Sequence, residues 1–190
     1  MKICVYGASS NDINKIHFDE SYKLGILIAT KGHTLVFGAG NHGVMGSVAR
    51  GANSAGGEII GISPRFFDYD DILYTECTEL IFTDTMRERK ELLENTSDAF
   101  VMAPGGIGTF EEFFEVLTLK QLDKHSKPIA VLNIEGYYNP MLEMLKHTVE
   151  KGFMRADCME IFRVFDNCEA VIDYIEKYNG SDVDLSKLKY

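Results

Sequence analysis

Few of the usual signs of a metal site, a disulfide framework or a membrane span occur in this sequence. There are four cysteines in 190 residues, and none forms a Cys-x-x-Cys pair. No two histidines stand at zinc-finger spacing, so no metal is expected. The cysteines are predicted to be free thiols, which suits a reducing cytoplasm. No apolar run approaches the roughly 18 residues of a membrane span, so no membrane partner is expected.

Basic residues are also scarce. Lys and Arg number 19 against 29 Asp and Glu, which gives a formal net charge of −10. Such a surface repels phosphate polymers, so a nucleic acid polymer is not expected as a partner. A small phosphorylated ligand stays compatible with this charge, because a few local cations can overcome the global field. The hydrophobic fraction of 45% and the charged fraction of 25% are typical of a globular protein.

Short apolar runs alternate with helical patterns along most of the chain. Strands are expected at 3–6, 34–37, 59–62, 79–82, 99–103, 129–133 and 161–165, and helices at 15–31, 44–55, 86–95, 110–122, 139–151 and 168–177. This alternation predicts a Rossmann-like α/β fold, with a doubly wound, mainly parallel sheet and helices on both faces.

We expect a single nucleotide-binding domain over 1–178, followed by a polar C-terminal tail at 179–190 that frays. The segment 64–78 has no clean periodicity. It is expected to form either a loop over the site or an extra strand.

Two glycine-containing loops follow the first and second expected strands, where ligands bind in sheets of this type. Gly7 and Ser9 stand in the first, whose small residues permit close approach to a phosphate or ribose; an ordinary strand-to-helix turn is the alternative. Gly38, Gly40 and Gly43 in the second match the pattern G-x-G-x-x-G. A dinucleotide site also needs an acidic residue at the end of the next strand, which here reads Gly-Ile-Ser-Pro. NAD is therefore not expected.

A third loop, PGGIGTFEE at 104–112, follows the fifth expected strand. Its glycines expose backbone amides just before a helix, and free amides with the helix dipole form an anion site that suits a phosphate. No lysine follows at Walker spacing, so ATP hydrolysis of that kind is not expected. Thr109 and Glu112 have the spacing of a capping box, so capping is the alternative to a catalytic role for Glu112.

Cations for such a site are expected from the segment 86–90, which contains Arg89 and Lys90. Thr85 and Glu88 have the spacing of another capping box, which predicts a helix that begins near Thr85. Arg89 and Lys90 then lie about one turn into that helix, close to the carboxyl end of the preceding strand. A solvated helix face is the alternative interpretation of these charges.

Taken together, these motifs resemble one known family. The segment 104–112 resembles the PGGxGTxxE signature of the LOG-like proteins, which are cytokinin riboside 5′-monophosphate phosphoribohydrolases long labelled as lysine decarboxylases. The segment 86–90 resembles the family's M-x-x-R-K run, and LVFGAGNHGVMG at 35–46 resembles its LVYGGGxxGLMG loop. Segments 5–10, 60–64 and 133–142 also fit. The glycine loops depart from the family pattern in several positions, which bears on the base of the substrate more than on the reaction.

The resemblance implies hydrolysis of the N-glycosidic bond of a nucleoside 5′-monophosphate to the free base and ribose 5-phosphate, with no metal or cofactor. The substrate is expected to be either a cytokinin riboside 5′-monophosphate or AMP. The resemblance further implies a homodimer, and it assigns Arg89 and Glu112 as the catalytic pair.

Nucleotide contacts are also implied by position. They are Glu79, Arg89, Lys90, Gly105, Gly106, Ile107, Gly108, Thr109, Phe110, Glu111, Glu112 and Thr118, with Gly7, Ser9, Gly38, Gly40 and Met86 as further possible contacts. The alternative function is a non-catalytic nucleotide-binding sensor or carrier of the same fold. Retention of Arg89, Lys90 and Glu112 together favours the enzyme, because binding alone does not require an acid beside the phosphate.

Overall fold

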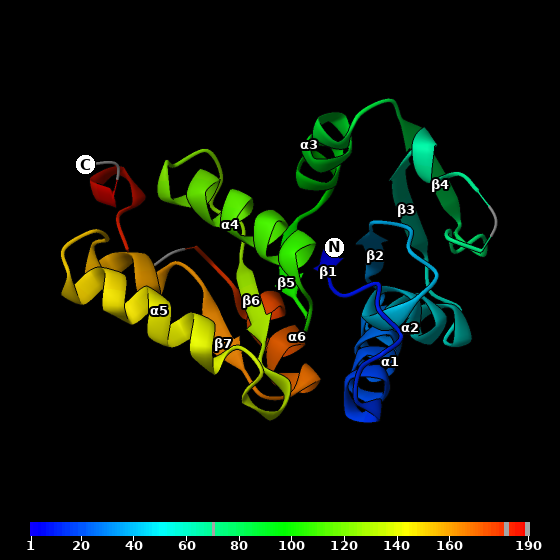
Figure 1. Cartoon of the computed structure of the whole chain (residues 1–190), viewed down its shortest axis with the longest axis horizontal. Coiled ribbons are helices and arrows are strands. Elements are labelled where there is room, and N and C mark those ends of the chain that lie inside the picture. Colours follow the sequence, from blue (N-terminus) through cyan, green and yellow to red (C-terminus); the bar gives the residue numbers. More distant parts are fainter. Residues whose placement is uncertain (70, 181–182, 189–190) are drawn as a thin grey trace.

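A computed structural model describes residues 1–69, 71–180 and 183–188. The described residues form strands that alternate with helices along the chain (Figure 1). The strands are β1 (Lys2–Tyr6), β2 (Thr34–Phe37), β3 (Ile59–Pro64), β4 (Glu79–Thr83), β5 (Ala99–Met102), β6 (Ile129–Leu132) and β7 (Arg163–Phe165). The α-helices are α1 (Lys15–Thr30), α2 (Gly43–Ser54), α3 (Met86–Thr96), α4 (Ile107–Gln121), α5 (Asn139–Glu150) and α6 (Cys168–Lys177). Within these ranges, no helix combines the length and the apolar character that crossing a membrane requires.

The strands form one seven-stranded sheet in the order β4-β3-β2-β1-β5-β6-β7. Every neighbouring pair is parallel, so the predicted doubly wound parallel sheet is confirmed. The chain moves outward from β1 to β4 on one side, and β5 then pairs with β1 on its other side. The carboxyl ends of β1 and β5 therefore flank the point where the strand order reverses, which is where open parallel sheets bind ligands.

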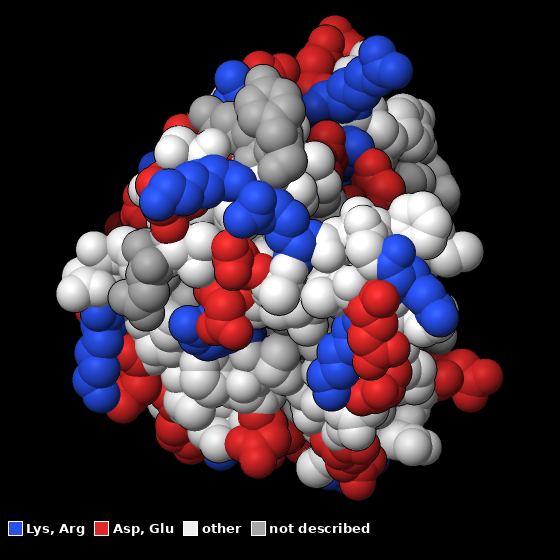
Figure 2. Space-filling model, turned by 90° about the vertical axis from the view of Figure 1, so that its left-hand side faces the viewer, with Lys and Arg blue, Asp and Glu red and all other residues white. Residues whose placement is uncertain are grey.

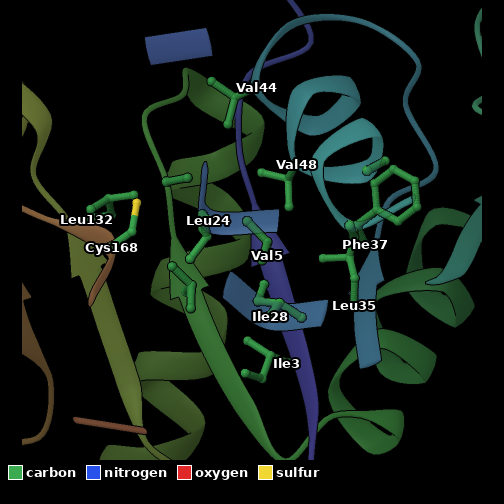
Figure 3. Close-up of a cluster of buried hydrophobic side chains, with 14 of the residues drawn as sticks. Ile3, Val5, Leu24, Ile28, Leu35, Phe37, Val44, Val48, Leu132 and Cys168 are labelled. Atoms are coloured by element: carbon green, nitrogen blue, oxygen red, sulfur yellow. The ribbon is translucent and has the colours of Figure 1, made fainter. Parts of the chain in front are cut away.

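Alternation along each strand sends side chains into two separate cores. Ile3 and Val5 pack with α1, α2 and α6 on one face, and Figure 3 shows this core with Leu24 and Ile28 of α1. Cys4 and Tyr6 point to the opposite face, which α3, α4 and α5 cover. Figure 1 likewise shows α1 and α2 on one side of the sheet and α3 and α4 on the other. Both faces are thus covered, as an all-parallel sheet requires.

Part of the C-terminal tail is better packed than the sequence predicted. A 3₁₀ helix forms at Leu185–Leu188, and Leu185 and Leu188 are buried against the core that contains α4. The expectation that 179–190 frays is therefore wrong for residues 183–188. Two leucines three residues apart share one face of a helical turn, and burying them fixes a segment that is otherwise polar.

The segment 64–78 forms a loop, apart from its first residue, which ends β3. A 3₁₀ turn follows at Arg65–Phe67, and Leu73 then makes an isolated antiparallel bridge to Gly40. No further strand forms among the described residues of this segment. The bridge holds the loop against the segment that joins β2 to α2.

Charge on the surface is mixed. On the face that Figure 2 draws, described acidic and basic side chains are interspersed. The chain's excess of acid is therefore not gathered into one separate region of that face.

Candidate functional site

The loops after β1 and β5 meet at the reversal point of the sheet. The backbone amide of Ala8 donates to the carbonyl of Pro104 at 3.0 Å, which joins the two loops directly. Gly105 lies so close to this junction that a Cβ there would stand 2.0 Å from Thr109 Oγ1 and 2.9 Å from the Ala8 amide nitrogen. Only glycine fits at this position without displacing a neighbour.

A cavity of about 340 Å³ opens above this junction, and we call it the first cavity. It is lined by Gly7, Ala8, Ser9, Ser10, Met45, Phe67, Met86, Arg89, Gly106, Ile107, Gly108, Thr109, Glu111 and Glu112. Three segments that are distant in sequence, the loop after β1, the start of α3 and the start of α4, therefore supply most of its wall.

The N-terminus of α4 faces the first cavity. The helix begins at Ile107 with Gly106 as its N-cap, and no side chain caps it. The first amides of the helix are thus free to bind an anion, and the helix dipole favours one there. Additional Cβ atoms at Gly106 and Gly108 would meet no atom within 4 Å, so both glycines border open space.

Thr109 and Glu112 do not form the capping box that their spacing suggested. The helix starts three residues earlier than predicted, so Thr109 lies inside its first turn and is buried. Glu112 instead bonds to Arg89 of α3. The capping interpretation is wrong because glycine at 106 lets the helix begin before the threonine.

Arg89 and Glu112 form a nearly buried ion pair. Arg89 Nη1 donates to Glu112 Oε1 at 2.8 Å, and the two side chains are only 8% and 11% exposed. Arg89 Nε also donates to the carbonyl of Ile62 near the end of β3, at 3.2 Å. The predicted capping box of Thr85 and Glu88 is confirmed at the start of α3. It fixes the helix start, and therefore the turn that carries Arg89.

Burial and charge act in opposite directions on Glu112. Burial raises the pKa of its carboxyl above the ordinary value of 4.5, while the Arg89 guanidinium lowers it. Burial prevails, so this acid titrates at a higher pH than an exposed glutamate. A carboxylate held in a partly dry site beside an open cavity can stabilise a developing positive charge or orient a water molecule.

Lys90 faces acids on α4 and not the cavity. Its Nζ pairs with Glu111 and, at 2.7 Å, with Glu115. Burial acts to lower the pKa of Lys90, but its bonds to Glu111 and Glu115 raise it overall. Lys90 therefore connects α3 to α4 next to the Arg89–Glu112 pair.

A second cavity of about 280 Å³ adjoins the first and shares Ser9, Met45, Phe67 and Arg89 with it. Its complete lining is Ser9, Gly38, Gly40, His42, Met45, Phe67, Tyr69, Ile72, Leu73 and Arg89. The loop at 64–78 thus provides an apolar and aromatic wall. The sequence pointed to this loop as a candidate, but not to Ile72 or Leu73 within it, since apolar residues in an irregular segment carry no periodicity. Met45 comes from the first turn of α2 and was not singled out as a site residue either.

The structure brings most of the predicted site residues to these two cavities, but not all. Glu79 is the first residue of β4, so it lies at the amino edge of the sheet, opposite the cavities. Thr118 stands near the far end of α4 and is exposed. Phe110 packs edge-on against Tyr138, with ring centroids 5.8 Å apart. None of these three lines either cavity, and neither do Lys90 and Gly105.

Two tyrosines that the sequence analysis did not single out hold the loop after β5. The Tyr137 hydroxyl donates to the Gly105 carbonyl at 2.9 Å, and the Tyr138 hydroxyl donates to the Ala103 carbonyl at 2.7 Å. Both come from the connection between β6 and α5. Adjacent tyrosines after a strand give no sequence signal of such a role, because the bonds depend on the tertiary fold.

No three His, Cys, Asp or Glu side chains gather into a metal-binding group within residues 1–69, 71–180 and 183–188. The four cysteines are all unpaired. The site therefore combines three features: the Arg89–Glu112 ion pair, the uncapped N-terminus of α4, and the apolar second cavity.

Comparisons with solved structures agree with this fold. The molybdenum cofactor carrier protein of Chlamydomonas reinhardtii superposes with a TM-score of 0.70 at 25% identity, over 93% of this chain and 95% of that one. The molybdenum cofactor binding protein of Rippkaea orientalis gives a TM-score of 0.71 at 23% identity, over 92% and 94% of the two chains. At this identity the likeness establishes the fold alone.

Comparisons of sequence identify the family. A family model described as "Possible lysine decarboxylase" matches residues 45–175. A rice protein named probable cytokinin riboside 5′-monophosphate phosphoribohydrolase is 34% identical over 190 residues, which are 100% of this chain and 78% of the rice protein. The cytokinin riboside 5′-monophosphate phosphoribohydrolase of Mycobacterium tuberculosis is 36% identical over 165 residues, covering 87% of this chain and 88% of that protein. The chain therefore belongs to the LOG family of phosphoribohydrolase-like proteins, the family that the lysine decarboxylase model describes and that its own motifs predicted.

Proposed function

We propose that this protein hydrolyses the N-glycosidic bond of a nucleoside 5′-monophosphate, releasing the free base and ribose 5-phosphate. The observation that carries the proposal is the buried Arg89–Glu112 pair, held between the first cavity and the uncapped N-terminus of α4. Relatives of nearly full length bear the name of this activity, which supports the same assignment.

The 5′-phosphate binds at the N-terminus of α4 in this proposal. The residues that open this helix, Gly106 to Thr109, line the first cavity. They offer donors and a favourable dipole to a phosphate in a chain whose overall charge is negative. Ser9 and Ser10, on the opposite wall, are placed to bond the phosphate or the ribose.

Glu112 and Arg89 act on the ribose. The bond from C1′ to the base nitrogen breaks with both electrons passing to the base, and positive charge develops on the ribose. The Glu112 carboxylate stabilises this charge and orients the water that adds to C1′; the proton lost by the water ends on the base. Arg89 opposes the effect of burial on Glu112 and so favours its ionised form.

The base occupies the second cavity. Met45, Phe67, Tyr69, Ile72 and Leu73 give this compartment an apolar wall that suits a purine ring and an apolar substituent on it. In this proposal the second cavity, which shares Arg89 with the first, takes the base on the far side of the scissile bond from the phosphate. We propose AMP and isoprenoid-modified AMP as the two substrates to compare.

The proposed working form is a homodimer in the cytoplasm. Leu122, directly after the last residue of α4, is 40% exposed, so apolar surface is available at this end of the helix. Sedimentation velocity at micromolar concentration measures the assembly, and a monomer throughout would contradict this part of the proposal. Four unpaired thiols fit a reducing compartment.

A base-release assay tests the proposed function. Purified protein is incubated with AMP and, separately, with isoprenoid-modified AMP in the presence of a chelator, and products are separated by chromatography. Free base and ribose 5-phosphate in equal amounts are expected, and adenosine, which lacks the phosphate, is the matched control that should turn over far more slowly. Binding of either nucleotide with no cleavage would instead favour the non-catalytic sensor or carrier.

A further inference from the structure

The loop after β2 lies directly against the side chain of Arg89. Gly38 follows the last residue of β2, and a Cβ built on it would stand 1.9 Å from Arg89 Nη2 and 3.1 Å from Arg89 Cζ. The guanidinium thus occupies the space that any larger residue at position 38 would fill. Sequence alone placed Gly38 among the possible substrate contacts, and nothing in it indicated Arg89 as the neighbour.

Three elements therefore hold the guanidinium at once. Gly38 bounds it on the side of β2, the Ile62 carbonyl accepts from Nε near the end of β3, and Glu112 on α4 accepts from Nη1. The side chain is 8% exposed, so solvent does not replace any of these contacts. A small displacement on the Gly38 side must alter the bond to Glu112, because the guanidinium is rigid and planar.

We propose that Gly38 is a positioning residue for the hydrolysis: the absence of a side chain there allows the Arg89 guanidinium to lie in the plane from which it bonds Glu112. The inference rests on the proposed function for its catalytic meaning and on the packing around Arg89 for its geometry.

Gly38→Ala is a conservative way to test this. Gly38 is not among the residues with positive φ, so alanine suits its backbone conformation. The atom that the new methyl group meets first is the end of a long side chain, which can rotate away without moving the backbone. We therefore expect the variant to fold, with the guanidinium displaced from Glu112.

The expected signature is a change in how activity depends on pH. Arg89 lowers the pKa of Glu112, so its displacement lets burial raise that pKa further. Glu112 also faces Lys90 of α3, Glu111 of its own helix, and Cys4 and Tyr6 of β1. The three atoms nearest to a methyl group at position 38 belong to Arg89 and Met45, and not to any of these four residues. Since the carboxylate is the active form, the acid limb of kcat against pH should move to higher pH in Gly38→Ala.

The rate should fall more than the affinity. A misplacement of about 1 Å of a positioned group costs about 100-fold in rate. We expect kcat for AMP to fall by about that factor. The Kd for ribose 5-phosphate, which lacks the base and so does not occupy the second cavity that Gly38 lines, should change much less because the phosphate-binding helix start is intact.

Gly40→Ala is the matched control for the pH shift. It adds the same methyl group two residues along the same loop, but there the new atom meets Met45 Cε at 2.6 Å and not Arg89. Its acid limb should stay at the wild-type position, whatever happens to its rate. An equal shift in both variants would overturn the assignment, because the effect would then belong to the loop in general.

A second arm combines Gly38→Ala with Arg89→Lys, which removes Nη2. If Gly38 acts through the guanidinium, kcat of the double variant should be less than about twofold below kcat of Arg89→Lys alone, since the contact between position 38 and Nη2 is already gone. If the fold-loss in kcat of the double variant equals the product of the losses of the two single variants, the proposal is overturned.

A readout without turnover separates this inference from the proposed function. Carbon-detected NMR titration of glutamate carboxyls, with the Glu112 signal assigned from Glu112→Gln, measures the pKa of Glu112 in the unliganded protein. A higher value in Gly38→Ala than in wild type supports the positioning role even if no nucleotide is cleaved, and an unchanged value refutes it. Failure of wild type to release base refutes the proposed function alone.

Discussion

Glu112→Gln tests the proposed chemistry most directly, because it removes one negative charge and keeps the shape of the side chain. Glu112 Oε1 accepts from Arg89 Nη1 at 2.8 Å, and the amide oxygen of glutamine can accept the same bond. The guanidinium should therefore stay in place. The positive charge that develops on the ribose is then left without its counter-charge, so the loss falls on the transition state and not on substrate binding.

The size of the effect follows from the site. Removing one group that stabilises transition-state charge in a preorganised pocket costs about 100- to 1000-fold in kcat. Because Glu112 carries a full charge and is only 11% exposed, we expect the upper end, which at about 1.4 kcal/mol per tenfold corresponds to about 4 kcal/mol. The affinity for AMP should change by less than about threefold.

Glu112→Ala separates stability from catalysis. It removes the carboxylate and leaves Arg89 bonded to the Ile62 carbonyl. Breaking a buried ion pair by removing one partner costs about 3–5 kcal/mol. For a chain of this length each kcal/mol lowers Tm by about 2–4 °C. Tm should therefore fall by about 10 °C in Glu112→Ala and by only a few degrees in Glu112→Gln.

The assay measures base release by chromatography, AMP affinity by calorimetry and Tm by circular dichroism. A Glu112→Gln variant that retains more than about a tenth of wild-type kcat would refute the role of the carboxylate. A variant that loses AMP binding together with activity would move Glu112 from transition-state stabilisation to ground-state binding.

Three further predictions concern neighbouring groups. Tyr137→Phe removes the hydroxyl that donates to the Gly105 carbonyl. The affinity for ribose 5-phosphate, measured by calorimetry, should fall about fivefold, while the affinity for adenosine should not change. Equal losses for both ligands would contradict a role of Tyr137 in holding the phosphate loop. Lys120 is fully buried, bonds the Tyr178 hydroxyl, and has its pKa lowered to about 8 by burial. Lys120→Met should raise Tm, because it removes a buried amine that is charged below pH 8. Wild type should regain stability relative to the variant as pH rises from 8 to 10.5, since in this range the amine is protonated in the unfolded chain but not in the folded protein. A difference in Tm that stays constant with pH would refute this. Burial and Glu115 raise the pKa of Glu94 to about 7. Wild type should therefore lose stability relative to Glu94→Gln as pH rises from 4.5 through 7, because the folded protein holds the proton in this range and the unfolded chain does not. Denaturant titrations at several pH values measure this difference, and a gain in the relative stability of wild type would refute the prediction.

Local patterns in the sequence predicted most of the fold. The strands at 34–37 and 59–62 were found because buried parallel strands are short, continuous apolar runs with polar ends. The α3 start was found because a capping box depends only on residues four apart or fewer. The last strand was expected to begin at 161 but begins at Arg163, because Ile161 and Phe162 are buried by packing after a 3₁₀ helix and imitate a strand.

The site was harder to predict where it depends on contacts across elements. Thr109 and Glu112 fit a capping box by spacing, and only the earlier helix start at Ile107 shows that Glu112 is free to bond Arg89. The bond from Tyr137 to Gly105 and the packing of Arg89 against Gly38 join residues that are 32 and 51 positions apart. No local pattern carries such information. The motif resemblance predicted that Arg89 lies near Glu112. It did not predict the contacts with Gly38 and the Ile62 carbonyl that orient Arg89.

The parallel arrangement of the sheet also determines where a tag or a surface can be attached without blocking the cavity. Lys2 begins β1 and Met1 bonds Thr34 at the start of β2, so the first residues lie at the amino edge of the sheet. At the other end, the Leu188 carbonyl accepts from Gln121 in the last turn of α4, a full helix length from the start of α4 that faces the cavity. An affinity tag, a dye or a surface linker joined near either of these points therefore sits remote from the cavity mouth. Immobilised protein should accordingly keep open access for nucleotides in solution.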